Sequence, residues 1–252
     1  MKQIEFKTQV LPHIIAILVF LLVTVIYFRP VFLQSKSLNQ HDIKQWEGGA
    51  KEVLDYRAQT GNEALWTDSM FGGMPAYLIS TKWGFGIMDG ITKVMALGLP
   101  HPTKIMFIAF LCFYIMLLSF GVRPYLAIAG ALAFGLTSYN IIGFSAGHNA
   151  RIAAIAYMPL VLAGIQTTFN RSLLTGLTLT FLGLALELHA GHLQITYYLI
   201  FIVLGYMVAS LVKNIKDKTM KSFVTKSAML LGVAILALGT FIGSFLTTME
   251  YS

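Results

Sequence analysis

The segment NQHDIKQW contains a carboxylate, Asp42, shortly after the first long apolar segment of the chain. A carboxylate at a membrane surface is suited to act as a general base that takes a proton from an acceptor hydroxyl. The alternative is structural, because Asp42 with Gln45 three residues later resembles the capping box that begins a helix. One residue can fill both roles, so Asp42 is the candidate catalytic residue.

Two segments rich in histidine, GHNAR (residues 147–151) and ELHAGHLQITYY (residues 187–198), each adjoin the end of an apolar segment. A single histidine at a membrane interface is as often solvated and without function as it is functional. Ionisable groups clustered at membrane depth, however, mark function by default, and these groups can bind a phosphate or a sugar hydroxyl. Asp68 is the next acid along the chain that we would test. With it, the candidate substrate-binding residues are Asp68, His148, Arg151, Glu187, His189, His192 and Gln194.

Metal binding is the alternative for part of this cluster, because Glu187, His189 and His192 offer ligand atoms within six residues. Zinc sites on helices need ligands that share one face. Ala190 and Gly191 predict a tight turn between the two histidines, which removes that spacing. The sequence therefore predicts no metal site, and a divalent metal stays open only as a cofactor.

The amino-acid composition indicates whether water or a lipid bilayer surrounds the elements that position these groups. Hydrophobic residues make up 56% of the chain and charged residues only 12%, about half the share in soluble domains. The net charge of +7 does not indicate nucleic-acid binding, because five lysines fall in the short stretch from Lys213 to Lys226 between two apolar segments. The one cysteine, Cys112, cannot form an intramolecular disulfide. These features predict an integral membrane protein.

A membrane span needs about 20 mostly apolar residues. The chain predicts an all-α, polytopic fold of about seven transmembrane helices, which makes residues 1–252 a single membrane domain. Since no small-residue cleavage site follows the first segment, we expect it to be an uncleaved anchor. The expected spans are Pro12–Phe28, Ile105–Phe120, Tyr125–Phe144, Ile152–Phe169, Leu173–Ala190, Leu193–Val212 and Ser227–Leu246.

Orientation follows from the lysines and arginines of the short loops, which concentrate in the cytoplasm. A cytoplasmic N-terminus leaves Arg151 as the basic residue of the short outer loops. The long segment 30–104 and the candidate site residues then face outward, as in a bacterial plasma-membrane protein. The basic residues placed inside are Lys2, Lys7, Arg123, Arg171, Lys213, Lys216, Lys218, Lys221 and Lys226.

The outer segment 30–104 contains all three tryptophans, Trp46, Trp66 and Trp83. Apolar residues at steps of three and four from Ile43 to Leu54 predict an amphipathic helix that lies along the membrane surface. Gly72, Gly73 and Pro75 predict a shaped loop in LWTDSMFGGMPAY. Phe85–Leu99 predicts a second, shorter amphipathic helix.

The order of these motifs resembles the N-terminal part of the YfhO-like bacterial membrane protein family, which belongs with the GT-C type of glycosyltransferase. NQHDIKQW, LWTDSMFGGMPAY, GHNARIAAIAYMPLVLAGI and GHLQITYY carry the resemblance and cover most of residues 35–200. Members of the family are longer and continue outward after a seventh span, so the resemblance implies that this chain corresponds to their N-terminal portion.

The resemblance implies an inverting glycosyltransferase that uses a polyprenyl-phosphate sugar as donor and acts outside the cytoplasm. Its partners would be membrane lipids, the lipid-linked donor and a cell-envelope polymer or glycolipid acceptor. In GT-C enzymes the catalytic acid lies early in the first outer loop, and that role carries over to Asp42. The alternatives are a non-enzymatic transporter, flippase or assembly subunit for envelope lipids, and a transferase of another group that shares the outer acid.

Overall fold

The computed structural model describes residues 5–82 and 86–250. Lys2, Trp83 and Phe85, which enter the sequence analysis, lie outside these ranges. The fold is all-α as expected: helices make up 79% of the chain, with one small hairpin. In chain order the elements are η1 (Phe6–Val10), α1 (Leu11–Tyr27), α2 (Arg29–Gln34), α3 (His41–Thr60), β1 (Trp66–Thr67), β2 (Met74–Pro75), η2 (Ala76–Leu78), α4 (Ile87–Met95), α5 (Thr103–Ser119), α6 (Pro124–Gly135), α7 (Ser138–Ala146), α8 (Asn149–Asn170), α9 (Leu173–His189), α10 (Leu193–Lys216), α11 (Met220–Thr240) and α12 (Ile242–Glu250).

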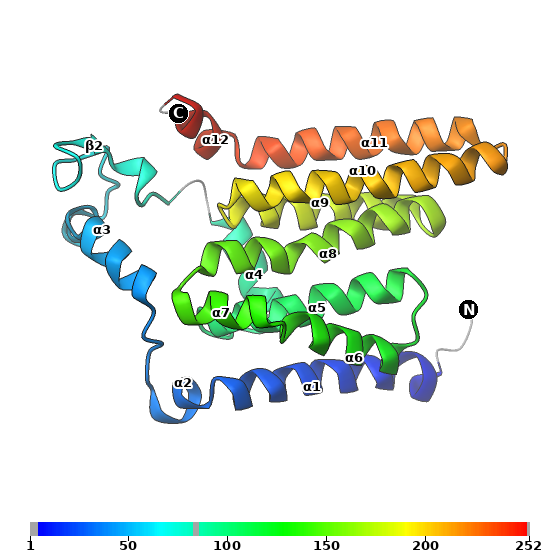
Figure 1. Cartoon of the computed structure of the whole chain (residues 1–252), viewed down its shortest axis with the longest axis horizontal. Helices are drawn as coiled ribbons and strands as arrows, with labels where there is room; N and C mark the ends of the chain where they lie inside the picture. Colours follow the sequence, from blue (N-terminus) through cyan, green and yellow to red (C-terminus); the bar gives the residue numbers. More distant parts are fainter. Residues whose placement is uncertain (1–4, 83–85, 251–252) are drawn as a thin grey trace.

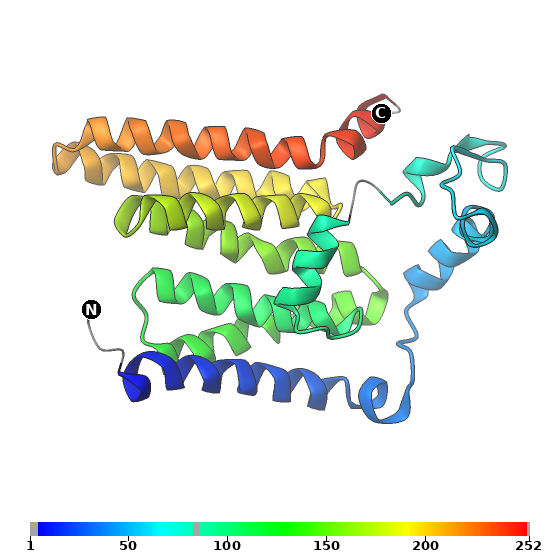
Figure 2. The ribbon, with the colours of Figure 1, turned by 180° about the vertical axis from the view of Figure 1, so that it is seen from behind.

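The long apolar helices lie side by side in one bundle (Figure 1). Both views place α3, the β1–β2 hairpin and α12 at one end of this bundle (Figures 1 and 2). Segment 30–104 therefore lies at one end of the bundle, and the turns between α8 and α9 and between α10 and α11 lie at the opposite end.

Length and composition qualify four helical stretches as membrane spans, and five if the bent pair α6–α7 crosses as one. The four are Phe6–Tyr27, Asn149–Asn170, Leu193–Lys216 and Met220–Thr240. The remaining expected segments form the shorter apolar helices α5 and α9, each of 17 residues. The chain is thus compatible with a multi-pass membrane protein.

Two of the expected spans are not continuous helices. The expected helix Ser227–Leu246 ends at Thr240, and α12 begins at Ile242. The expected helix Tyr125–Phe144 is divided into α6 and α7, which meet at an angle of 45°. Glycine and hydroxyl residues interrupt both segments, at Leu136-Thr137-Ser138 and at Gly239-Thr240, but the apolar residues on either side keep the averaged hydropathy high.

The break between α6 and α7 is closed by the protein's own groups. Asn140 Nδ2 donates to the carbonyl of Phe134 at 3.1 Å and to that of Gly135 at 3.4 Å. A Cβ at Gly135 would lie 2.2 Å from the ring of Phe110, so this glycine admits the ring against the backbone. Backbone groups freed at membrane depth must find such internal partners.

Helices α8 and α9 pack closely through small residues, as helices commonly do in membranes. A Cβ at Gly164 would lie 2.4 Å from the backbone nitrogen of Thr180, and one at Gly176 would lie 2.3 Å from that of Thr168. Gly183 approaches Val161 of α8 in the same way. This contact fixes α8, whose first turn carries the site described below.

The predicted amphipathic helix at the start of the outer segment is α3. Ala50 and Val53 on its apolar face are fully buried. Trp46 on the same face donates through Nε1 to the carbonyl of Ile79 at 3.1 Å. The shaped loop predicted for residues 65–77 contains the β1–β2 hairpin, in which Trp66 pairs with Pro75. Part of the apolar face of α3 therefore packs against the outer segment itself.

Candidate functional site

Asp42 and His148, both candidate residues from sequence, are in direct polar contact, with His148 Nε2 2.7 Å from Asp42 Oδ2. Their side chains are about half-buried, at 44% and 38% exposure. The capping-box alternative for Asp42 is wrong: Gln40 is the residue at the start of α3, and Asp42 lies within the first turn. A carboxylate there is stabilised by the positive end of the helix.

A buried pair of amides holds the two segments together. Gln40 Nε2 donates to Asn149 Oδ1 at 3.0 Å, and Asn149 Nδ2 donates to Gln40 Oε1 at 3.1 Å. Gln40 Nε2 also donates to the carbonyl of Phe144 at 2.7 Å. Since both amides are nearly fully buried, an unpaired partner would be costly. The bonds fix the start of α3 against the α7–α8 turn, which places Asp42 beside His148.

Gly147, between α7 and α8, makes this approach possible. Its φ of +98° lies in the left-handed region that side chains disfavour. A Cβ there would meet Gln40 Cβ at 3.1 Å and the backbone nitrogen of Ile43 at 3.2 Å. The absence of a side chain therefore lets the backbone of α3 approach the turn that carries His148.

An open cleft of about 490 Å³ adjoins the pair through His148, which lines it, whereas Asp42 lies behind His148 and does not. His148, Arg151 and His192 line it, so three of the predicted substrate-binding residues share one cavity. His148 begins α8 and His192 begins α10, and neither helix has a side-chain cap on its first amide groups. Two helix N-termini and a guanidinium at one cleft favour an anion such as a phosphate.

Arg151 is held by stacking rather than by a carboxylate. Its guanidinium carbon lies 4.8 Å from the centre of the Tyr139 ring. Its Nε is buried without a hydrogen-bond partner among the described residues, and so are Nδ1 of His148 and Nδ1 of His192. Buried nitrogen atoms without a partner in one cleft call for an additional bonding group. A bound anion or ordered water would supply it.

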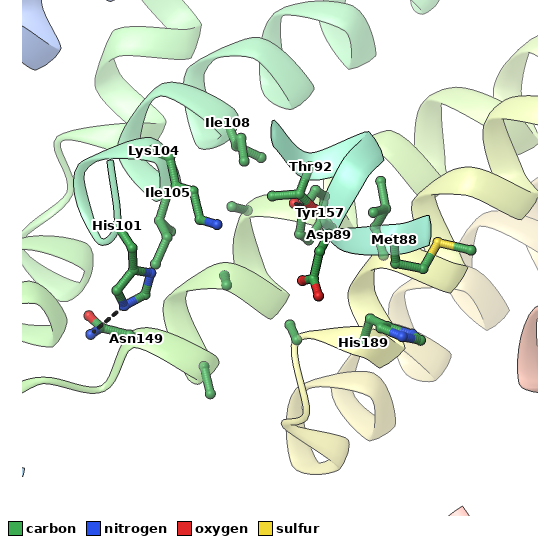
Figure 3. Close-up of a pocket in the computed structure, with 15 residues that line it drawn as sticks. Met88, Asp89, Thr92, His101, Lys104, Ile105, Ile108, Asn149, Tyr157 and His189 are labelled. Carbon is green, nitrogen blue, oxygen red and sulfur yellow. Dashed lines mark hydrogen bonds between the residues drawn. The ribbon is translucent and has the colours of Figure 1, made fainter. Parts of the chain in front are cut away.

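A second cavity of about 300 Å³ adjoins the cleft, because His101 and Asn149 line both. Figure 3 shows the side chains of Asp89 from α4 and Lys104 from α5 extending into this cavity. Its apolar wall includes Ile105 of α5. A mainly apolar cavity with a few convergent polar groups is typical of a ligand site.

His101 links the two cavities through Asn149, whose Nδ2 lies 3.2 Å from His101 Nε2 (Figure 3). Burial lowers the pKa of His101 below its ordinary value of 6.5, and the charge of Lys104 lowers it further. The neutral imidazole is therefore favoured. Its unprotonated nitrogen can accept the hydrogen bond from Asn149.

The structure separates the other predicted binding residues from the cleft beside Asp42. His189 lines the second cavity. Glu187 is fully buried between α9 and α10, where Thr196 Oγ1 donates to both carboxylate oxygens at 3.0 Å. Gln194 donates to the hydroxyl of Tyr198 at 2.8 Å. The expected tight turn between His189 and His192 is present at Ala190 and Gly191.

Asp68 lies at the β1–β2 hairpin, away from Asp42. It accepts a hydrogen bond from Trp66 Nε1 at 3.1 Å. Its neighbour Ser69 donates through the backbone to Glu52 of α3 at 3.1 Å. The hydroxyl of Thr67 holds the pKa of Glu52 below its ordinary value. Asp42 and Glu52 are about 15 Å apart along α3, at about 1.5 Å per residue. Asp68 therefore stabilises the hairpin rather than joining the cleft.

Within the described residues, no three His, Cys, Asp or Glu side chains are grouped so that they could hold a metal ion. Asp42 and His148 supply two such groups in contact. The divalent metal left open as a cofactor therefore has no site built from these side chains. The chemistry proposed below uses none.

The sequence analysis did not identify Gln40, Asp89, His101 or Lys104 as site residues. The second expected amphipathic helix, Phe85–Leu99, does contain Asp89, and α4 forms within that range. The acidic side chain of Asp89 on this helix could therefore have indicated a site residue. Gln40 is only two positions before Asp42 in the sequence, but its hydrogen-bond partner Asn149 is distant. No local pattern could reveal that pairing.

Comparisons with known proteins add no relative: no family, curated protein or solved structure matches the chain.

Proposed function

We propose that the chain forms a membrane domain of about seven spans with the activity of a GT-C type glycosyltransferase, similar to the YfhO-like family. It transfers a sugar from a polyprenyl-phosphate donor to a cell-envelope acceptor, with the N-terminus in the cytoplasm and the site facing outward in a bacterial plasma membrane. The observation that carries the proposal is the contact of Asp42 with His148 beside a cleft that also contains Arg151 and His192.

Asp42 is the general base of the proposed reaction. Its carboxylate accepts the proton of the acceptor hydroxyl as that oxygen attacks the anomeric carbon. The bond between this carbon and the donor phosphate oxygen breaks, and polyprenyl phosphate leaves with the bonding electrons. One displacement at the anomeric carbon inverts its configuration.

The groups across the cleft suit the leaving phosphate. Negative charge develops on it during bond cleavage, and fixed donors lower the barrier most when they face that charge. Arg151 supplies a permanent positive charge. His192 supplies a ring nitrogen, and the N-termini of α8 and α10 add positive dipole ends. This arrangement supports separate roles for Asp42, which accepts the proton, and for the groups across the cleft, which stabilise the leaving phosphate.

The adjoining cavity suits the sugar. Asp89 and Lys104 can exchange hydrogen bonds with hydroxyl groups. Thr92 and Tyr157, which lie 3.1 Å apart through their hydroxyl oxygens, add two more groups on its wall. The shared residues His101 and Asn149 connect this cavity to the cleft, so a sugar here and a phosphate beside Arg151 would be contiguous.

The broken span α6–α7 is the observation that favours the alternative of a transporter, because broken helices form transport sites near the membrane midplane. Here the carbonyls at the break accept bonds from Asn140, and Phe110 fills the space at Gly135. The charged groups that line the cleft and the second cavity lie instead at one end of the bundle. This distribution supports chemistry at the surface over passage through the bundle.

The discriminating experiment measures donor consumption in detergent, where no compartments exist. The purified protein is incubated with a polyprenyl-phosphate sugar and envelope extract as acceptor, and release of polyprenyl phosphate is followed. A glycosyltransferase releases polyprenyl phosphate in proportion to acceptor. Intact donor in detergent, together with donor movement across reconstituted vesicles, would replace the enzyme with a transporter.

A further inference from the structure

A polar cavity of about 420 Å³ lies between α8, α10 and α11, at the end of the bundle opposite the candidate site. Asn170 of α8 and Asn214 of α10 line it with their amides. Tyr206 adds a hydroxyl, and Lys213 and Lys226 add ammonium groups. The proposed glycosyl transfer uses none of these residues.

The length of α8 places this cavity relative to a membrane. Asn149 lines the outer clefts, and Asn170 lines the new cavity. At about 1.5 Å per residue they lie about 32 Å apart along α8. A hydrocarbon core is about 30 Å thick. If α8 crosses the bilayer, the cavity lies at the headgroup level of the leaflet opposite the candidate site.

Aromatic side chains at this level agree with an interfacial position. Phe169 stacks on Phe223 of α11 with ring centres 5.6 Å apart. Tyr206 meets Phe169 at 6.4 Å and Phe120 at 6.3 Å. Amphipathic tyrosine is enriched where the apolar core meets the headgroups. These aromatic contacts agree with a cavity at the headgroup level of a membrane that α8 spans.

The two lysines are positioned by the protein but are not neutralised by it. Lys226 Nζ donates to the carbonyl of Phe169 at 2.9 Å, and Lys213 Nζ lies 3.4 Å from Asn170 Oδ1. Asp217 also lines the cavity, but neither lysine forms an ion pair with it or with another carboxylate within the described part of the chain. Each ammonium has three donor hydrogens. One bond therefore leaves further donors for an anion.

The polar wall is ordered by its own hydrogen bonds. Asn170 Nδ2 donates to Gln166 Oε1 at 2.9 Å, and the hydroxyl of Tyr206 donates to the same oxygen. Thr219 Oγ1 donates to Asn214 Oδ1 at 2.7 Å. Lysines that serve only to orient a protein in the membrane need no such wall. Preorganised amides and hydroxyls around two ammonium groups are typical of a binding site.

We infer that this cavity binds the phosphate of an anionic phospholipid headgroup from the leaflet opposite the candidate site. Lys213 and Lys226 contact the phosphate, while the amides and hydroxyls bond the polar part of the headgroup. Basic pockets between membrane helices on the cytoplasmic side bind such headgroups. The lysine-rich turn of α10 and α11 is the segment that the sequence predicts to be cytoplasmic.

The test measures the thermal unfolding midpoint of the delipidated full chain in detergent. Three additions are compared: phosphatidylglycerol, phosphatidylcholine and inorganic phosphate. The first variant carries Lys213→Gln and Lys226→Gln. A matched control carries Lys216→Gln and Lys221→Gln, which remove the same charge from exposed lysines that do not line the cavity. Native mass spectrometry counts the lipid retained by each protein.

Phosphatidylglycerol is expected to raise the unfolding midpoint of the wild type and the control, with phosphatidylcholine and inorganic phosphate much less effective. The cavity variant should bind phosphatidylglycerol at least about tenfold more weakly than the control, since it loses hydrogen bonds to a charged group. Equal losses in both variants would reduce the effect to surface charge and overturn the inference. An equal response to inorganic phosphate, or no response of the wild type to phosphatidylglycerol, would also overturn it.

Discussion

The Nε2 atom of His148 lies 2.7 Å from Oδ2 of Asp42, while Nδ1 of the same ring is buried. With one nitrogen facing the carboxylate and the other enclosed, the imidazole has no free nitrogen to present to a substrate. The second carboxylate oxygen of Asp42, on a side chain 44% exposed, is the more accessible group. This relationship makes Asp42 the base and His148 the residue that orients it.

Gly147→Ala is expected to lower both stability and sugar transfer. A left-handed conformation costs a non-glycine residue about 1–2 kcal/mol, and the new Cβ would also press on Gln40 and Ile43. Gly61→Ala is the matched control, since Gly61 has a φ of +73° with nothing within 4 Å. The two variants are compared by thermal unfolding and transfer rate. If Gly61→Ala slowed transfer as much as Gly147→Ala did, backbone strain alone would explain the loss.

Acidification is expected to destabilise the protein through His101. Burial and Lys104 lower its pKa in the folded state, so the unfolded chain binds the proton more readily. The stability from neutral His101 is therefore fully present above about pH 6.5 and is lost as pH falls through the lower folded pKa. Unfolding midpoints of the wild type and His101→Gln should converge below pH 6.5. A difference that stayed constant from pH 8 to pH 5 would contradict this role.

The contact of α8 with α9 is expected to tolerate no added methyl group at Gly164. A Cβ there would lie 2.4 Å from the backbone of Thr180. The helices must then separate, at about 1–3 kcal/mol for an overpacked site. Gly232→Ala in α11 is the control, because nothing lies within 4 Å of that glycine. Thermal unfolding should show a loss for Gly164→Ala only. Similar midpoints for both variants would mean that α8 and α9 pack less closely.

The sequence predicted those features of the fold that local patterns determine. The amphipathic spacing from Ile43 to Leu54 predicted α3, because one apolar face is visible within a few turns. The break after Gly135 was missed, because the apolar residues on both sides outweigh Thr137 and Ser138 in the averaged hydropathy, and the bonds of Asn140 that close it are visible only in the structure. Hydropathy records composition, whereas a bend depends on individual hydrogen bonds.

The candidate site was predictable in residue type but not in grouping. Histidine and arginine at the ends of apolar segments identified His148, Arg151 and His192, which line one cleft. Glu187 has the same sequence context, yet the packing of α9 on α10 buries it against Thr196. Which end groups converge depends on long-range packing that one-dimensional spacing does not contain.

The orientation of the chain is testable with single cysteines in a Cys112→Ala background. Lys44→Cys in α3 and Lys216→Cys in α10 are both exposed positions. A reagent that does not cross membranes should label position 44 on intact cells, and position 216 only after permeabilisation, because short basic loops stay inside. The opposite labelling pattern would place the proposed site in the cytoplasm.

The most direct test compares initial rates of sugar transfer for the wild type, Asp42→Asn and Asp55→Asn in the purified protein. Asp55 is a carboxylate on the same helix that pairs with Lys51, apart from the cleft. Loss of a general base should slow transfer by about 10²–10⁴-fold in Asp42→Asn, with unfolding nearly unchanged and Asp55→Asn close to wild type. Transfer by folded Asp42→Asn at nearly the wild-type rate would contradict the assignment of Asp42 as the base.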